Sequence, residues 1–257
     1  MGCACYRIVR RYDVGMEGQR DLFGEAGQVG WDVRRSTRAR RLAIRVHPEG
    51  RVEIIVPAHA SASVVQTFVA RHRHWIERKL AERRGHAPTD ETFPPRMLQL
   101  AAFEESWPIE LEPTLGVKRP LSYDGSVLRV AEAATPANLR RHLLRWLLEH
   151  VRDGFAARLQ TLARESGLRH SSLQVRRQRT RWGSCSRRGA ISLNVCGVFQ
   201  RPPVLRYLML HELVHLRHMN HSVDYWRAVE DLCPDWRALD RELTQGWRQV
   251  PRWVFEA

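Results

Sequence analysis

One short pattern, H-E-x-x-H, constrains this chain more than any other; it is formed by His211, Glu212 and His215 and is followed by His221. Residues four apart lie on one face of an α-helix, so His211 and His215 can point at the same metal ion. Glu212 can reach a water on that ion without being a ligand itself. Zinc with three protein ligands keeps a fourth position for water, whose pKa it lowers to roughly 7. The pattern therefore predicts a zinc site in which Glu212 takes the proton of the attacking water.

The third ligand is not determined by this spacing. We expect His221, because Asn220 is typical of the left-handed position that ends a helix, and a turn there would bring His221 back towards the other two histidines. His218 is an alternative, although it would still lie on the helix or its last turn. Glu230 and Glu242 are further alternatives, since some zinc hydrolases take a later glutamate as the third ligand.

The composition of the chain indicates the cellular compartment in which it folds. Hydrophobic residues make up 43% of it, which supports a substantial core, and no run of about 18 apolar residues is present that would predict a membrane span. The first residues lack the apolar region of a secretion signal. Five cysteines at irregular spacing favour a reducing compartment over a disulfide framework. We therefore expect a cytoplasmic protein that makes no membrane contact; no pattern indicates its oligomeric state.

Positive charge is concentrated in two arginine clusters within a chain of net charge +14. Residues 34–51 hold seven arginines and one acidic residue, and residues 169–188 hold seven arginines and no acidic residue. The simpler interpretation of both clusters is a solvated strand face. The alternative is a nucleic-acid partner that binds through them.

The first third of the chain combines a hairpin with a helix. Residues 1–30 show no periodicity and are expected to form a loose extension. Apolar residues alternate with other residues in 42–46 and again in 52–56, which predicts a β-hairpin with one buried face. A helix capped by Ser61 or Ser63 follows. After a linker at residues 86–95 we expect four short strands, at 98–102, 107–111, 121–123 and 127–130.

Helices dominate the remainder. Pro136 opens the longest one, which carries a single apolar stripe and ends at Gly167. Pro202 and Pro203 suit the start of the helix that carries His211, and Ser222 and Asp235 are expected to cap the last two helices. Three strands are expected between the longest helix and the histidine-bearing one, at 173–177, 180–186 and 190–194.

Three stretches in this order resemble one known family. They are R-W-G-S-C-S at residues 181–186, I-S-L-N at 191–194 and H-E-L-V-H-L-R-H-M-N-H-S-V-D-Y-W at 211–226. Together they resemble the YgjP-like zinc metallopeptidases, which are related to the SprT-like group, and the resemblance extends over roughly residues 31–233. Tyr225 stands where that family usually has Phe.

The resemblance implies an α+β fold. A zincin-like metallopeptidase core, made of a long helix, a small antiparallel sheet and the H-E-x-x-H helix, would occupy residues 136–257. An N-terminal β-rich lobe with one helix would occupy residues 31–135, behind the extension at 1–30.

The resemblance also implies hydrolysis of polypeptides. His211, His215 and His221 match the family's zinc ligands, and Glu212 matches its catalytic acid/base. Candidate contacts to substrate or transition state are Tyr225, His218, Arg181 and Trp182, although Trp182 would equally suit the core. Two alternatives stand beside a general metallopeptidase: a nucleic-acid-associated protease of the SprT-like kind, which acts on DNA-bound proteins, and a non-catalytic binding protein stabilised by zinc.

Overall fold

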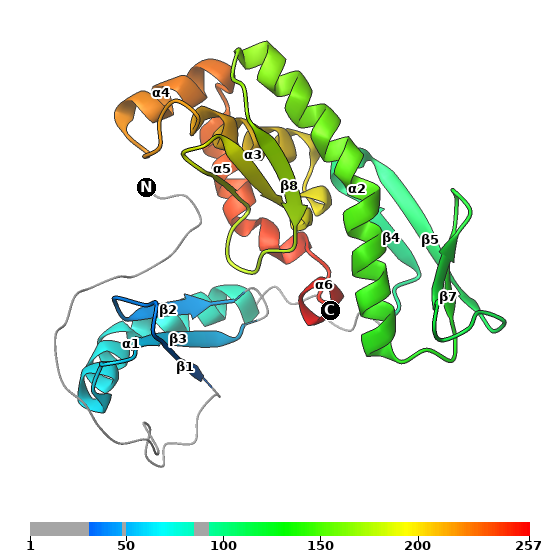
Figure 1. Ribbon diagram of the computed structural model, residues 1–257, viewed down its shortest axis with the longest axis horizontal. Helices are drawn as coiled ribbons and strands as arrows, with labels where there is room; N and C mark the ends of the chain where they lie inside the picture. Colours follow the sequence, from blue (N-terminus) through cyan, green and yellow to red (C-terminus); the bar gives the residue numbers. More distant parts are fainter. Residues whose placement is uncertain (1–30, 48–49, 85–92) are drawn as a thin grey trace. The chain divides into compact units, whose positions relative to one another are not determined.

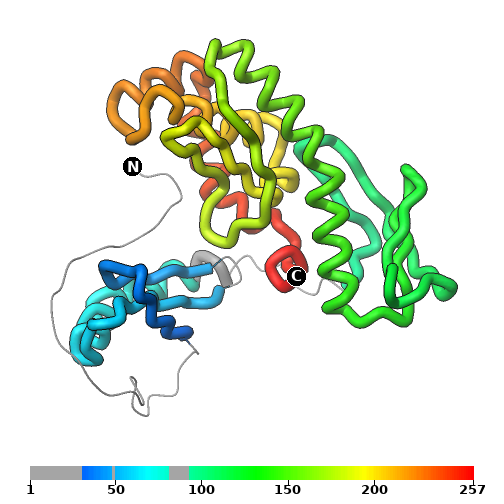
Figure 2. The backbone as a smooth tube through the Cα atoms, in the orientation of Figure 1, coloured from blue at the N-terminus to red at the C-terminus, as the bar shows by residue number. Residues whose placement is uncertain are grey.

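The computed structural model describes residues 31–47, 50–84 and 93–257 (Figure 1, Figure 2). The described residues up to 84 form one compact unit, and those from 93 onwards form a second. The extension expected at 1–30 and most of the linker expected at 86–95 lie outside the described residues. No helix among the described residues is both long and apolar enough to span a membrane.

The first unit is a three-stranded sheet packed on one helix. Its strands β1 (Asp32–Ser36), β2 (Ala43–Val46) and β3 (Val52–Pro57) lie in the order β1-β3-β2. The hairpin between β2 and β3 is antiparallel as expected, whereas the pairing of β1 parallel to β3 was not foreseen. Helix α1 (Ala62–Arg84) follows Ser61, whose hydroxyl accepts a hydrogen bond from the Val64 amide at 3.4 Å. Alternate β3 residues and the apolar stripe of α1 form a separate core.

The second unit begins with a four-stranded sheet. Strands β4 (Met97–Leu100), β5 (Glu105–Glu112), β6 (Leu121–Tyr123) and β7 (Leu128–Ala131) lie in the order β4-β5-β7-β6. Helix α2 (Pro136–Ser166) follows, and it begins after Thr135, whose side chain accepts from the Asn138 amide. It ends at Gly167, which has a φ of 67° and provides the left-handed cap that glycine adopts without strain.

The boundary expected between residues 135 and 136 does not match this division. Leu98, Ile109 and Val130 from the four-stranded sheet belong to the same hydrophobic cluster as Leu143 and Leu147 of α2. The sheet buries its apolar face on this helix, so it is part of the second unit rather than of an N-terminal lobe.

A second sheet of this unit contains β8 (Ser172–Arg176), β9 (Gly183–Cys185) and β10 (Ala190–Asn194), in the order β8-β10-β9. The small sheet that we expected to be antiparallel is mixed, because β9 is antiparallel to β10 but β8 runs parallel to it. The connection from β8 crosses to the far side of β10, where the Asn194 side chain donates to the carbonyl oxygens of Gln178 and Arg181 at 2.7 Å each. That crossing shortens the strand expected at 180–186 and leaves β9 at the sheet edge.

Four more α-helices are described in this unit: α3 (Pro202–Val214), α4 (Val223–Leu232), α5 (Trp236–Gln245) and α6 (Trp253–Glu256). Helix α3 begins at the two prolines as expected and packs against α2, α4 and α5 (Figure 1). Ser222 caps α4 by accepting from the Tyr225 amide. Asp235 precedes α5, but its side chain accepts no capping hydrogen bond, so that expected cap is absent.

Candidate metal centre

Three histidines converge at the end of α3. One ring nitrogen from each of His211, His215 and His221 lies within 4.8 Å of the other two. The Nε2 atoms of His211 and His221 are 3.2 Å apart. Two nitrogens bound tetrahedrally to one zinc at 2.0–2.1 Å would be about 3.3 Å apart, so this spacing suits a shared ion. Among the described residues this is the one group of three or more metal-ligating side chains.

The route from the second to the third histidine differs from the expected one. Helix α3 ends at Val214, and His215 follows in right-handed conformation at the cap. The amides of Leu216 and Arg217 then bond three residues back, in a tightened last turn. Asn220 does not adopt the left-handed backbone that we expected. Among the described residues other than glycine, only Glu104 has a positive φ. His221 does return to the other two histidines, but without the left-handed residue that we expected at Asn220.

The three alternative ligands lie outside this group. His218 has left the helix and contributes its carbonyl oxygen, which accepts from His215 Nδ1 at 2.9 Å. Glu242 is bound by Arg201 at 2.8 and 2.6 Å, and Glu230 forms an ion pair with Arg237. Both carboxylates are thus engaged elsewhere.

Burial favours the neutral, ligating form of the imidazoles. It lowers the pKa of His211 well below its usual value, and the neighbouring His215 and His221 lower it further. Burial likewise lowers the pKa of His215 and of His221. Metal binding requires neutral imidazole, so the environment of these side chains agrees with the chemistry of an imidazole-bound ion.

Tyr225 packs between the histidines with its side chain fully buried. Its ring stacks on His215 with centroids 4.7 Å apart, and it meets His221 edge-on at 4.7 Å. Its hydroxyl donates to the carbonyl oxygen of His211 at 3.1 Å. The hydroxyl is therefore bonded to the backbone of α3.

Glu212 lies beside the histidines with an orphaned oxygen. Its side chain is 4% exposed, and its Oε2 has no hydrogen-bond partner among the described residues. Burial raises the pKa of Glu212 to about 8, against an opposing effect from the positive charge of Arg181. A Cβ on Gly183 would lie 2.8 Å from the Cδ of Glu212, so a glycine in β9 is what makes room for this carboxyl.

The remaining predicted contacts divide between surface and core. Arg181 is exposed next to β9, and its charge acts on Glu212. Trp182 is 3% exposed and stacks on Trp247 at a centroid distance of 4.0 Å, which agrees with the core interpretation of this residue.

Sequence reasoning missed Gly183 as a neighbour of Glu212, and it also missed two polar residues near His211. Tyr207 lies four residues before His211 on the same helix, and that spacing was a usable signal. Asp240 approaches from α5, and nothing local in the sequence announces it.

Comparison with known proteins identifies the family. No curated protein matches the chain significantly. Among solved structures, the metallopeptidase zymogen of Pyrococcus abyssi abylysin is similar to part of it: the match covers 35% of this chain and 92% of that one, with 24% sequence identity and a TM-score of 0.32. The family model for the YgjP-like metallopeptidase domain matches residues 40–246, which is most of the chain. The protein therefore belongs to the YgjP-like metallopeptidase family.

Proposed function

We propose that this protein is a zinc-dependent peptidase in which His211, His215 and His221 hold the ion and Glu212 is the general base. The observation that carries the proposal is the convergence of three imidazoles, those of buried His211, His215 and the more exposed His221, beside a buried carboxyl with an unpartnered oxygen. A set of neutral nitrogen ligands suits zinc better than magnesium or calcium, which prefer oxygen.

When bound, zinc supplies Lewis acidity, which polarises a peptide carbonyl and acidifies the attacking water. Glu212 accepts the proton of that water and passes it to the departing amine. A cation nearby favours the ionised form of this carboxyl, which is the form a base needs. Because Gly183 has no Cβ, it leaves room for the Glu212 side chain against β9.

The substrate binds, in this proposal, as an extended chain along β9. This strand pairs with β10 on one side and is the edge of its sheet. Extended peptides add to such an edge through main-chain hydrogen bonds. Arg181 and His218 are our candidates for contacts to the substrate or to the developing oxyanion. For Tyr225 we propose a packing role, because its hydroxyl is bonded to the His211 carbonyl.

Metal content of two histidine variants tests the ligand set. His221→Ala should lower zinc affinity by more than about 100-fold, beyond the usual effect of losing a partner outside the ligand set. His218→Ala is the matched control, since it removes a nearby imidazole that lies outside the triad, and it should retain zinc. Zinc would be measured by atomic spectroscopy after dialysis. Full zinc content in His221→Ala would contradict the assignment.

Hydrolysis of unfolded polypeptides by the zinc-loaded protein tests the activity. Cleavage should stop with a chelator and return with zinc. A protein that binds zinc tightly through the three histidines and cleaves no polypeptide would instead be the zinc-stabilised binding protein.

A further inference from the structure

His211 is connected to a carboxylate on another helix through a tyrosine. Tyr207, one turn earlier on α3, has its hydroxyl oxygen 3.4 Å from Nδ1 of His211. The same hydroxyl donates to Oδ1 of Asp240, on α5, at 2.8 Å. Tyr207 is fully buried and His211 is 3% exposed, so this connection lies within the protein interior.

The direction of the two hydrogen bonds follows from counting protons. A tyrosine hydroxyl carries one hydrogen, and an ionised carboxylate can only accept. The Tyr207 hydrogen therefore goes to Asp240, at the shorter distance, and the Tyr207 oxygen is left to accept from Nδ1 of His211. Burial raises the pKa of Asp240, and the Tyr207 hydrogen bond and the positive charge of Arg241 oppose that rise.

This arrangement has a consequence for the other nitrogen of the ring. A neutral imidazole with its proton on Nδ1 has its lone pair on Nε2. Nε2 is the atom of His211 that lies 3.2 Å from His221 Nε2. His215 is held in the same way by a different acceptor, since its Nδ1 donates to the carbonyl oxygen of His218.

We propose that Asp240, acting through Tyr207, is a positioning residue that fixes the tautomer and orientation of His211 for metal binding. The inference rests on the proposed function, in which His211 is a zinc ligand. It assigns a task to α5, which supplies no residue to the histidine triad. Partners of this kind, outside the ligand set, commonly change metal affinity by about 10–100-fold when they are removed.

The first test is made without metal. Long-range ¹H–¹⁵N NMR of the metal-free protein reports which nitrogen of His211 carries the proton. The wild type should show the Nδ1–H form. Asp240→Asn and Tyr207→Phe should each shift His211 towards the Nε2–H form. A wild type with its proton on Nε2, or variants with an unchanged tautomer, would overturn the proposal, whether or not the protein is a peptidase.

The second test measures zinc affinity by competition with a chromophoric chelator. Asp240→Asn should weaken binding about 10–100-fold, and the double variant with Tyr207→Phe should be little weaker than either single one, because both remove the same connection. Asp240→Glu, which keeps the carboxylate, should recover part of the affinity. Asp235→Asn is the matched control, since this exposed residue precedes the same helix and caps nothing; it should bind zinc like the wild type.

The outcomes separate the two proposals. Wild-type zinc affinity in a folded Asp240→Asn protein, or additive losses in the double variant, would overturn the positioning role while the three-histidine site stands. Zinc binding that does not depend on His221 would instead contradict the proposed function. The NMR experiment would still show which nitrogen of His211 carries the proton.

Discussion

Two buried glutamates, Glu212 and Glu53, have pKa values that their surroundings shift in opposite directions. Glu212 in α3 is 4% exposed and Glu53 in β3 is 9% exposed. Burial raises the pKa of Glu212 to about 8, because only Arg181 opposes it. Burial also raises the pKa of Glu53, but the Arg34 hydrogen bond and the positive charges around this carboxyl outweigh it and leave the pKa below its ordinary value.

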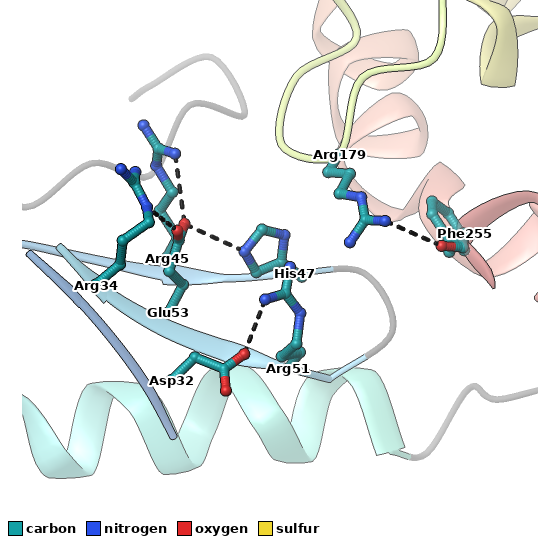
Figure 3. Close-up of polar contacts among 8 residues, drawn as sticks. All are labelled: Asp32, Arg34, Arg45, His47, Arg51, Glu53, Arg179 and Phe255. Carbon is teal, nitrogen blue, oxygen red and sulfur yellow. Dashed lines mark hydrogen bonds and ion pairs between the residues drawn. The ribbon is translucent and has the colours of Figure 1, made fainter. Parts of the chain in front are cut away.

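The difference lies in the partners of each carboxyl. Figure 3 shows Arg34, Arg45 and His47 around Glu53. Arg34 Nε donates to Oε1 at 2.7 Å, and Arg45 and His47 approach Oε2 at 3.5 Å each. Glu212 has an oxygen without any such partner among the described residues. Cations around a buried carboxyl stabilise its ionised form in the folded protein. A buried carboxyl without such partners costs stability, and it is expected mainly where it serves a reaction.

The largest expected difference between the two is in catalysis. Glu212→Gln should retain zinc and lower the rate of peptide hydrolysis by roughly 10²–10⁴-fold, the usual contribution of a general base. Glu53→Gln is the matched control, because it makes the same chemical change at a similarly buried position, and it should hydrolyse near the wild-type rate. Wild-type turnover in Glu212→Gln, measured with equal zinc content, would refute the role of the base.

A smaller loss is expected when Glu212 is displaced without being replaced. In Gly183→Ala the new methyl group would come within 2.8 Å of the Glu212 side chain, which must then move. Because misplacing a reacting group by about 1 Å can cost about 100-fold, we expect a loss of that order, mainly in kcat. Gly116→Ala, at an open position, is the control. An unchanged kcat in Gly183→Ala would mean that Glu212 tolerates the shift.

The features that sequence predicted well are those set by neighbouring residues. The prolines at the start of α3, Gly167 at the end of α2 and the hydroxyl of Ser222 before α4 each act within one helical turn. The i, i+4 spacing likewise brought His211 and His215 together, as the helix requires.

The features that sequence missed depend on long-range pairing. The alternation in β3 predicts one buried face, yet it does not say that β1 pairs parallel to it or which cations meet Glu53. Nor does any local pattern predict that β8 runs parallel to β10, or that Asp240 reaches Tyr207 across 33 positions of sequence. Asn220 shows that a local preference can also mislead. Asparagine favours the left-handed region at a helix end, yet α3 ends in a tightened turn and Asn220 does not adopt that backbone.

Glu53→Gln and Glu212→Gln should affect the free energy of unfolding in the opposite order to their effects on catalysis. Glu53→Gln removes the charge that faces Arg34, Arg45 and His47, and should destabilise residues 31–84 by about 1–2 kcal/mol, less than a fully buried pair because both arginines are partly exposed. Glu212→Gln in the metal-free protein should be neutral or stabilising, since it removes a buried carboxyl whose Oε2 has no partner. Hydrogen exchange of peptides from each unit measures both. A destabilising Glu212→Gln would mean that this carboxyl has a structural role.

The control for Glu53 lies in the same unit. Glu77→Gln breaks an exposed i, i+4 pair with Arg73, and should cost less than about 0.5 kcal/mol. An equal loss from Glu77 and Glu53 would show that burial of the latter adds nothing.

The smallest effect concerns pH. Because the folded pKa of Glu53 lies below its ordinary value of 4.5, the carboxylate stabilises residues 31–84 fully above that value. Its contribution should disappear as the pH falls from about 4.5 through the lowered folded pKa, where the native carboxyl itself becomes protonated. Urea unfolding followed by NMR amide intensities of this unit, compared between wild type and Glu53→Gln, should therefore show a stability difference at neutral pH that closes in acid. A difference that persists unchanged to about pH 3 would mean that the hydrogen-bonding shape of the side chain, rather than its charge, stabilises the sheet.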